Sequence, residues 1–109
     1  LYTDYINLKN QINRFNEKDL KMLAEQIKIS VEGNPNKYDS INEQRLKINQ
    51  RKILFIVNYA MNNGSNPISA FISYKFRENI NKKYLEKIYE NLSGEIKNSY
   101  YGVKLNSSF

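Results

Sequence analysis

Tyrosine and cationic side chains are the residues of this sequence best suited to act on another molecule. The chain has nine tyrosines, and six of them fall in or beside its basic half: Tyr59, Tyr74, Tyr84, Tyr89, Tyr100 and Tyr101. Aromatic rings interleaved with Lys and Arg can stack on unpaired nucleic-acid bases while the cations contact phosphates. The same rings can also be core or half-buried surface, which is the interpretation we favour for Tyr59 and Tyr89.

Catalytic and metal-binding chemistry has little support in the sequence. The absence of Cys and His excludes disulfides, thiolate nucleophiles, Cys/His zinc sites and histidine general bases. The carboxylate pairs Glu86/Glu90 and Asp19/Glu25 fall on ordinary helix faces among lysines, without the contrasting environments that an acid–base pair needs. The four glycines are isolated, so there is no phosphate-binding loop. We therefore predict no enzyme, no metal site and no cofactor.

The net charge of +6 is unevenly distributed along the chain. Residues 1–35 carry five basic and five acidic groups, whereas residues 36–92 carry ten basic groups against five acidic ones. This excess suits a nucleic acid or an acidic protein surface as partner, although a solvated lysine-rich surface has the same composition. No apolar run approaches the roughly 20 residues that cross a bilayer, so we expect no membrane contact and a cytoplasmic location. Because the chain starts at Leu1 rather than Met, we expect it to be part of a longer protein.

Two helices are predicted before residue 33. The first covers Thr3–Phe15, where apolar residues recur at imperfect helical spacing. Asn16 has the position of an N-cap for a second helix, in which the apolar residues form a regular stripe: Leu20, Leu23, Ala24, Ile27 and Val31. Gly33 is a natural C-cap and Pro35 prevents continuation, which predicts a loop over residues 33–39.

Capping signals predict where the next two helices begin. Ser40 and Glu43 have the spacing of a capping box, so a helix is expected from about residue 41 to residue 62. This helix is either continuous or bent near Asn49. Asn66 and Pro67 then predict, as N-cap and first helical residue, a helix that runs to about residue 78.

The C-terminal part is predicted to hold one more helix and a tail. Asn81 can cap a helix whose end lies near Gly94. Residues 95–109 are polar and rich in Ser and Asn, which predicts a mobile tail. The sequence has no sustained strand alternation and no heptad series long enough for a coiled coil. The predicted fold class is therefore all-α, a small single-domain bundle of about five helices over residues 1–94.

Residues 51–83 are the most informative stretch, because they join two apolar helices through an Asn-Gly-Ser-Asn-Pro turn and end in a basic run. One face of this helix pair is expected in the core: Ile53, Ile56, Val57, Phe71, Ile72 and Phe76. The cations are expected to face outward, and they are our candidate partner- or DNA-binding residues: Arg51, Lys52, Lys75, Arg77, Lys82 and Lys83. Exposed cations favour fast, salt-sensitive association.

The part of this stretch from Ile53 to Lys83 resembles the C-terminal module of the DnaD-like primosome proteins. In that family an Asn-containing turn leads into a helix marked Y-x-x-x-I-x-x-x-W, which is followed by a basic, Asn-containing exit. The corresponding residues here are Ile68, Ile72 and Phe76, so Ile stands for Tyr and Phe stands for Trp. The resemblance implies that the motif keeps its packing role, whereas the family's DNA-contact role depends on the aromatics that are replaced.

A DnaD-like domain is also the C-terminal part of RepA-type replication initiators of low-G+C Gram-positive plasmids, and the abundance of Asn, Lys and Ile fits such a source. The resemblance implies a non-enzymatic adaptor that recruits host primosome proteins, such as primase, helicase or helicase loader, to a plasmid origin. Two alternatives stay open. One is a single-stranded DNA-binding module in which Tyr74 or Tyr84 stacks on bases, and the other is an oligomerisation domain.

Overall fold

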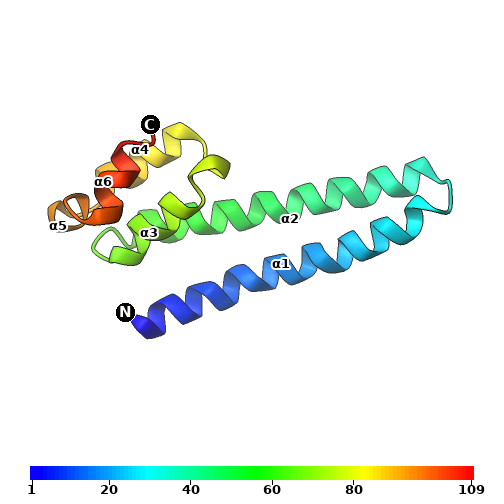
Figure 1. Ribbon diagram of the computed structural model, residues 1–109, viewed down its shortest axis with the longest axis horizontal. Coiled ribbons are helices and arrows are strands. Elements are labelled where there is room, and N and C mark those ends of the chain that lie inside the picture. Colours follow the sequence, from blue (N-terminus) through cyan, green and yellow to red (C-terminus); the bar gives the residue numbers. More distant parts are fainter. The chain divides into compact units, whose positions relative to one another are not determined.

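Helices make up all of the regular secondary structure, which confirms the predicted all-α class. The computed structural model describes all 109 residues. Its helices are α1 (Tyr2–Ser30), α2 (Pro35–Asn62), α3 (Pro67–Lys75), α4 (Lys82–Asn91), α5 (Gly94–Lys97) and α6 (Tyr100–Asn106), with a 3₁₀ helix, η1, at Arg77–Asn79 (Figure 1).

The chain divides into two compact units. The hairpin unit consists of residues 6–52, which include most of α1 and the first part of α2. The globular unit combines residues 1–5 with residues 53–109. The domain boundary predicted after residue 94 falls inside the globular unit, which includes residues 95–109.

α1 is one continuous helix rather than the two helices predicted on either side of Asn16. Asn16 does not cap a helix start, because its side-chain oxygen accepts a hydrogen bond from Lys52 Nζ at 3.1 Å. Asparagine is tolerated inside a helix when its amide bonds to another group instead of competing for nearby backbone groups. The N-cap prediction at Asn16 is therefore wrong, since the amide is used to join α1 to α2.

The turn between α1 and α2 is shorter than predicted, since α2 begins at Pro35. Gly33 has a φ of 71°, the left-handed conformation that commonly follows a helix. Asn34 Oδ1 accepts a hydrogen bond from the Lys37 N–H at 3.2 Å. Asn34 and Pro35 therefore start α2 as an N-cap and a first helical residue, and Pro35 opens a helix instead of preventing one.

α2 continues past the breaks that the sequence suggested. Ser40 and Glu43 lie inside the helix, so the predicted capping box is wrong. The physical reason is that a helix already started at Pro35 leaves no orphan N–H groups at these positions for the two side chains to satisfy. Asn49, the suggested site of a bend, donates from its amide to the Arg45 carbonyl oxygen at 2.9 Å, and the helix is continuous there.

The two helices of the hairpin unit meet along a seam that the apolar pattern did not predict. Buried and half-buried positions of α1 recur at alternating intervals of four and three residues: Leu8, Ile12, Phe15, Asp19, Met22, Gln26 and Ile29. The matching positions of α2 are Ile41, Arg45, Ile48 and Lys52. This is the heptad spacing of paired helices in a coiled coil. It was not recognised in the sequence because polar residues occupy several of the inward positions.

The predicted apolar stripe of α1 lies largely outside this seam. Leu20, Ile27 and Val31 are 62%, 61% and 86% exposed. The stripe has the spacing expected of a buried face, but the seam lies one residue earlier, where Asp19 is held inward by Arg45 of α2 at 2.8 Å. One position along a helix turns a side chain by about 100°, which is enough to exchange a buried face for an exposed one.

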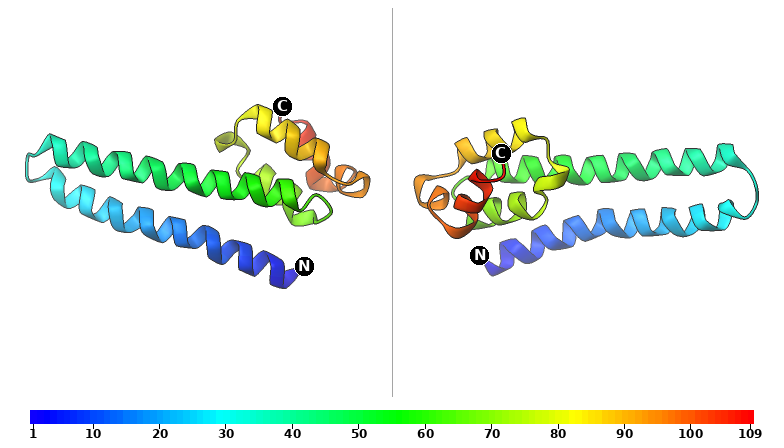
Figure 2. Two further views of the ribbon diagram at one scale, coloured as in Figure 1. Left: turned by 180° about the vertical axis from the view of Figure 1, so that it is seen from behind. Right: turned by 45° about the horizontal axis from the view of Figure 1, so that its top comes forward.

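The core of the globular unit draws on the end of α2 and on the helices that follow it (Figure 2). Its buried apolar residues are Ile56, Val57, Ala60, Ile68, Ala70, Ile72, Ile80, Leu85, Ile88, Leu92, Ile96 and Leu105. Three of the six residues predicted to lie in this core are buried, and three are half-buried. The half-buried ones are Ile53, Phe71 and Phe76.

α3 and α4 begin where their capping residues predicted. Asn66 accepts a hydrogen bond from the Ile68 N–H at 3.0 Å, and Pro67 is the first residue of α3. Asn81 caps α4 by accepting a hydrogen bond from the backbone N–H two residues on, at 2.9 Å. α3 ends at Lys75 rather than near residue 78, because η1 follows it.

The predicted mobile tail is instead two short packed helices, α5 and α6. Gly94, predicted as a C-cap, is the first residue of α5, and Ser93 and Ser99 cap α5 and α6 with their hydroxyl groups. Leu105 is completely buried, and a Cβ at Gly102 would overlap backbone carbonyl oxygens of α5. The Ser-rich composition was misread as a sign of mobility, since the serines cap helices.

A tail that packs into the core makes a testable prediction. Leu105→Ala should lower the free energy of unfolding by about 2–5 kcal/mol, because it removes buried methyl groups and leaves a cavity. Val103→Ala is the matched control on the same helix, and its effect should stay within about 0.5 kcal/mol because Val103 is 55% exposed. Urea denaturation followed by circular dichroism measures both, and equal effects would show that α6 does not pack.

Candidate interaction surfaces

The six cations predicted as site residues are divided between the two units. Arg51 and Lys52 belong to the hairpin unit, and the other four belong to the globular unit. Lys52 is half-buried and donates to Asn16, so it helps to hold the two helices of the hairpin unit together. Arg51 is exposed. The predicted site therefore reduces to a basic stretch on the globular unit, which consists of Lys75, Arg77, Lys82 and Lys83.

The first two cations of the basic stretch lie against aromatic rings. The Arg77 guanidinium carbon is 4.2 Å from the centroid of the Tyr74 ring, and Arg77 Nη1 donates to the Tyr74 carbonyl oxygen at 2.9 Å. Lys75 Nζ is 5.9 Å from the centroid of the Phe76 ring. A guanidinium over a ring is attracted by its π electrons, so Arg77 is held in place while keeping its charge available to a partner.

The other two cations of the basic stretch, Lys82 and Lys83, are exposed in the first turn of α4. No acidic residue lies in this turn, and neither lysine is within ion-pair distance of a carboxylate. A positive charge at a helix N-terminus opposes the helix dipole by about 0.3–1 kcal/mol. These two lysines therefore occupy positions where their charge disfavours the helix.

The three residues that correspond to the family motif, Ile68, Ile72 and Phe76, have mainly a packing role. Ile68 and Ile72 of α3 are 5% and 3% exposed, and they lie in the core. Phe76 is half-buried at the end of α3. The two buried residues fix the helix that carries Lys75 and precedes Arg77, so they position the cations without meeting a partner themselves.

Five aromatic rings form a contiguous cluster in the globular unit: Tyr5, Phe71, Tyr74, Tyr100 and Tyr101. We call it the aromatic cluster. Tyr101 is its centre, with ring centroids 5.0 Å from Phe71, 5.1 Å from Tyr100 and 5.9 Å from Tyr74. Most of these pairs meet edge to face, the arrangement that aromatic quadrupoles favour.

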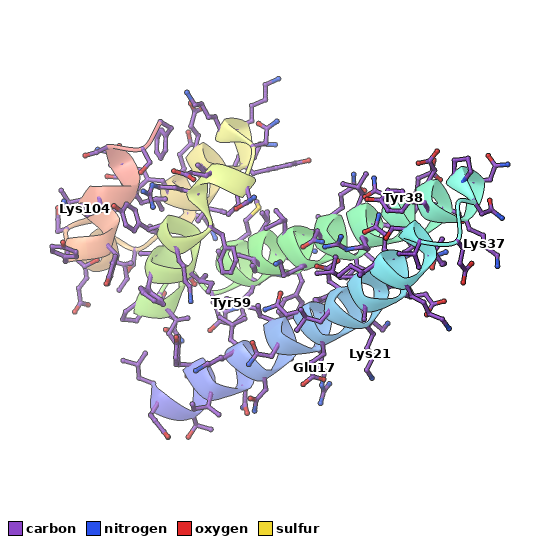
Figure 3. All side chains as sticks on the ribbon, turned by 45° about the vertical axis from the view of Figure 1, so that its right-hand side comes forward. Glu17, Lys21, Lys37, Tyr38, Tyr59 and Lys104 are labelled. Carbon is purple, nitrogen blue, oxygen red and sulfur yellow. The ribbon has the colours of Figure 1, made fainter.

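Two cations lie over outer rings of the aromatic cluster. Arg77 covers Tyr74, and Lys104 Nζ is 5.6 Å from the centroid of Tyr100. Lys104 is labelled on α6 in Figure 3. Tyr100 is 69% exposed, so its ring remains open to a ligand. The cluster thus combines an accessible aromatic face with positive charge, which is the combination that the sequence suggested for Tyr74, Tyr100 and Tyr101.

An open apolar groove borders the aromatic cluster. Its walls are formed by Leu1, Tyr2, Tyr5, Pro67, Ile68, Phe71 and Tyr101. Tyr2 is 79% exposed at its edge. Apolar walls of this kind can receive either nucleic-acid bases or apolar side chains of a protein segment. Sequence reasoning missed Tyr5 because only the fold brings it beside Phe71, and it missed Lys104 because residues 95–109 were predicted to be a mobile tail.

The remaining tyrosines lie outside the aromatic cluster. Tyr59 is half-buried, and burial, with the Asp4 charge as a second cause, raises the pKa of its hydroxyl. Tyr89 packs edge to face against Phe109, with ring centroids 5.8 Å apart, and it has Lys97 Nζ 5.3 Å from its centroid. These contacts match the structural role favoured for both residues. Tyr84, proposed as a stacking residue, is 46% exposed on α4.

The hairpin unit has a polar network in the middle of its seam. Arg45 donates to Asp19 through Nε at 2.8 Å and through Nη2 at 3.3 Å, and it donates to Gln26 Oε1 through Nη1 at 2.7 Å. Gln26 in turn donates to Asn42 Oδ1 at 3.2 Å. The hydrogen bond from Arg45 is the main cause that lowers the pKa of Asp19, and it likewise raises the pKa of Arg45.

Sequence reasoning also missed a group of exposed cations on the hairpin unit, which we call the basic face. Each of its cations is exposed and immediately precedes a seam residue, which places all of them on one flank of the helix pair: Arg14, Lys18, Lys21, Lys28, Lys47 and Arg51. Within the two helices, Glu25 is the one acidic residue that immediately precedes a seam residue. Residues 1–35 appeared neutral by count, but Asp19 is inward and paired with Arg45, so the outward charge of α1 is more positive than its composition.

Clusters of metal-ligating side chains and membrane-spanning helices are both absent from this structure. No group of three or more carboxylates or other ligand side chains is placed to hold a metal ion. No helix combines the length and the apolar character that a membrane span requires. Comparison with protein-family models, with curated protein sequences and with solved structures gave no match.

The polar network predicts how stability depends on pH. Because the folded-state pKa of Asp19 is below its ordinary value of 3.8, its contribution is present above that value and is lost as the pH falls through the folded-state pKa. Asp19→Asn should therefore lower the free energy of unfolding by roughly 1–2 kcal/mol at pH 7, as expected for a charge-assisted hydrogen bond. Urea denaturation should show a smaller loss at pH 2.5.

Glu17→Gln is the matched control for that measurement. Glu17 is exposed in the middle of the same helix, so its substitution should leave the free energy of unfolding within about 0.5 kcal/mol at both pH values. If Asp19→Asn cost the same at pH 7 and at pH 2.5, the carboxylate would not be the group that Arg45 stabilises.

Proposed function

We propose that this chain is a non-enzymatic adaptor domain of a DNA-replication assembly, related to the DnaD-like part of plasmid initiators. In this role the basic stretch of the globular unit docks on an acidic surface of a host replication protein, such as primase, helicase or helicase loader. The observation that carries the proposal is the position of Lys82 and Lys83. They are exposed without ion pairs at the start of α4, where their charge disfavours the helix.

Charged side chains that destabilise their own helix are expected at positions where they bind a partner. Replacing Lys82 and Lys83 by neutral residues would remove an unfavourable interaction of about 0.3–1 kcal/mol each with the helix dipole. Functional surfaces are the places where such local conflicts are expected to persist. Ile68 and Ile72 are buried and hold α3 in the core, while the cations that follow α3 remain on the surface. This arrangement also supports a role of the cations in binding a partner.

Charge reversal tests the adaptor function. The triple variant Arg77→Glu, Lys82→Glu, Lys83→Glu should lower recovery of the purified replication protein in a pull-down by about tenfold or more, because like charges then face each other. The matched control is Lys21→Glu, Lys28→Glu, Lys47→Glu on the hairpin unit, which changes the net charge by the same amount. Equal recovery by the first variant and the wild type would remove the basic stretch from the interface.

Single-stranded DNA binding is a second candidate function, and the aromatic cluster is the observation that favours it. Tyr100 offers an exposed ring beside Lys104, and Tyr74 carries Arg77 on its face. Rings next to cations bind unpaired bases by stacking while the charges contact phosphates. The groove beside the cluster extends this surface with further apolar walls.

Oligonucleotide titration separates this candidate from the adaptor. Tyr100→Ala should weaken binding of a labelled single strand by about tenfold, in line with one lost stacking contact. Tyr84→Ala, a substitution of another exposed tyrosine outside the cluster, should leave the affinity unchanged. Affinity should fall steeply with salt if cations displace counterions from phosphates. Lack of binding at low salt would exclude the second candidate.

A further inference from the structure

The hairpin unit has an apolar face on the flank opposite to its basic face. Leu20, Leu23 and Ile27 each follow a seam residue of α1 by one position, and Leu46 follows Arg45 of α2 in the same way. In antiparallel helices, positions that follow the seam lie on one side of the pair for both helices. These four residues therefore share one side, which we call the leucine face.

The leucine face is exposed to an extent that requires an explanation. Leu20, Ile27 and Leu46 are 62%, 61% and 56% exposed, and Leu23 is half-buried where the face meets the seam. Single exposed apolar residues are ordinary, whereas a contiguous group on one face marks an interaction surface. Leu23 adjoins Met22 of the seam, so the face is joined to an existing helix–helix interface at that position.

We propose that the leucine face is the interface between two copies of this chain, which pair their hairpin units into a four-helix bundle. In a two-fold dimer the same patch of both copies meets, so the patch must not carry like charges that would repel each other. Lys9 is the one charged residue among the positions that follow the seam within the hairpin unit. The basic face fails this condition, because a second copy would bring its lysines and arginines together.

Three asparagines on the same flank as the leucine face already hold hydrogen bonds within one copy. Asn16 accepts from Lys52, Asn42 accepts from Gln26, and the Asn49 amide donates to the Arg45 carbonyl oxygen. Each of these asparagines also follows a seam residue, so they lie between the apolar side chains. Burying polar groups that keep hydrogen bonds costs far less than burying unsatisfied ones, so a second copy can cover this face.

The dimensions of the face suit a dimer. The helices of the hairpin unit are roughly 27–37 Å long at 1.5 Å per residue, and the pair is about 20 Å wide, which gives a face of about 550–750 Å². Standard interfaces bury about 600–1,000 Å² on each partner, so this flank of the hairpin unit reaches the lower part of that range. Two hairpins packed side by side would also form the four-helix arrangement that such amphipathic pairs favour.

Sedimentation equilibrium of the 109-residue chain over a range of concentrations tests the proposal. The wild type should be a dimer at tens of micromolar, and Leu20→Glu combined with Ile27→Glu should raise the dissociation constant by about 100-fold or more, because charges replace the central apolar contacts. Leu46→Glu, on the other helix, should weaken the dimer independently. Circular dichroism should show unchanged helicity, since all three residues are exposed in one copy.

The control variant is Lys21→Glu combined with Lys28→Glu, which places the same side chains on the opposite flank of α1. It should leave the dissociation constant within a few-fold of the wild-type value. A wild-type chain that is monomeric at about 200 µM, far above physiological protein–protein dissociation constants, would overturn the proposal. A dimer that persists in the folded leucine-face variants would do the same.

Discussion

The fork of Arg45 sets the register on which the hairpin unit depends. Its guanidinium holds Asp19 with two nitrogens and Gln26 with the third, so that two turns of α1 are fixed against one residue of α2. A polar group inside a helix seam specifies one register, because any slip would leave a partly buried charge without its partner. Everything that faces outward on this unit follows from that choice.

Two chemically different flanks result from this register. Residues that precede the seam are mostly cationic, and residues that follow it are apolar or amides, as Lys21 and Leu20 illustrate. Rotating α1 by one residue would bury Leu20 and Ile27 and expose Asp19, which is the arrangement that hydrophobicity alone suggests. The seam therefore buries polar side chains and leaves Leu20 and Ile27 exposed within one copy. Such an exposed apolar surface is expected of a unit that packs against a partner.

The globular unit follows the simpler logic of apolar burial and capping. Asn66 with Pro67 starts α3, and Asn81 starts α4, at the residues that their types predicted. Isoleucines of α3 fill the core, and their helix carries a cation at its end. The last two helices close the unit through Leu105, and this closure brings Tyr100 and Tyr101 to the rings contributed by α1 and α3. The candidate interaction surface thus depends on a segment whose composition had suggested a tail.

The helical class, the caps at Asn66 and Asn81, and the core positions Ile56, Val57 and Ile72 could all be predicted from the sequence, because they depend on contacts near in the chain or on a dense apolar pattern. The sequence did not determine that Asp19 points inward, that Ser93 and Ser99 start helices, or that Tyr5 meets Phe71. Those outcomes depend on partners distant in the chain. The buried flank of α1 depends on a partner distant in the chain, since Asp19 faces inward where Arg45 of α2 pairs with it and would otherwise leave a partly buried charge unpaired.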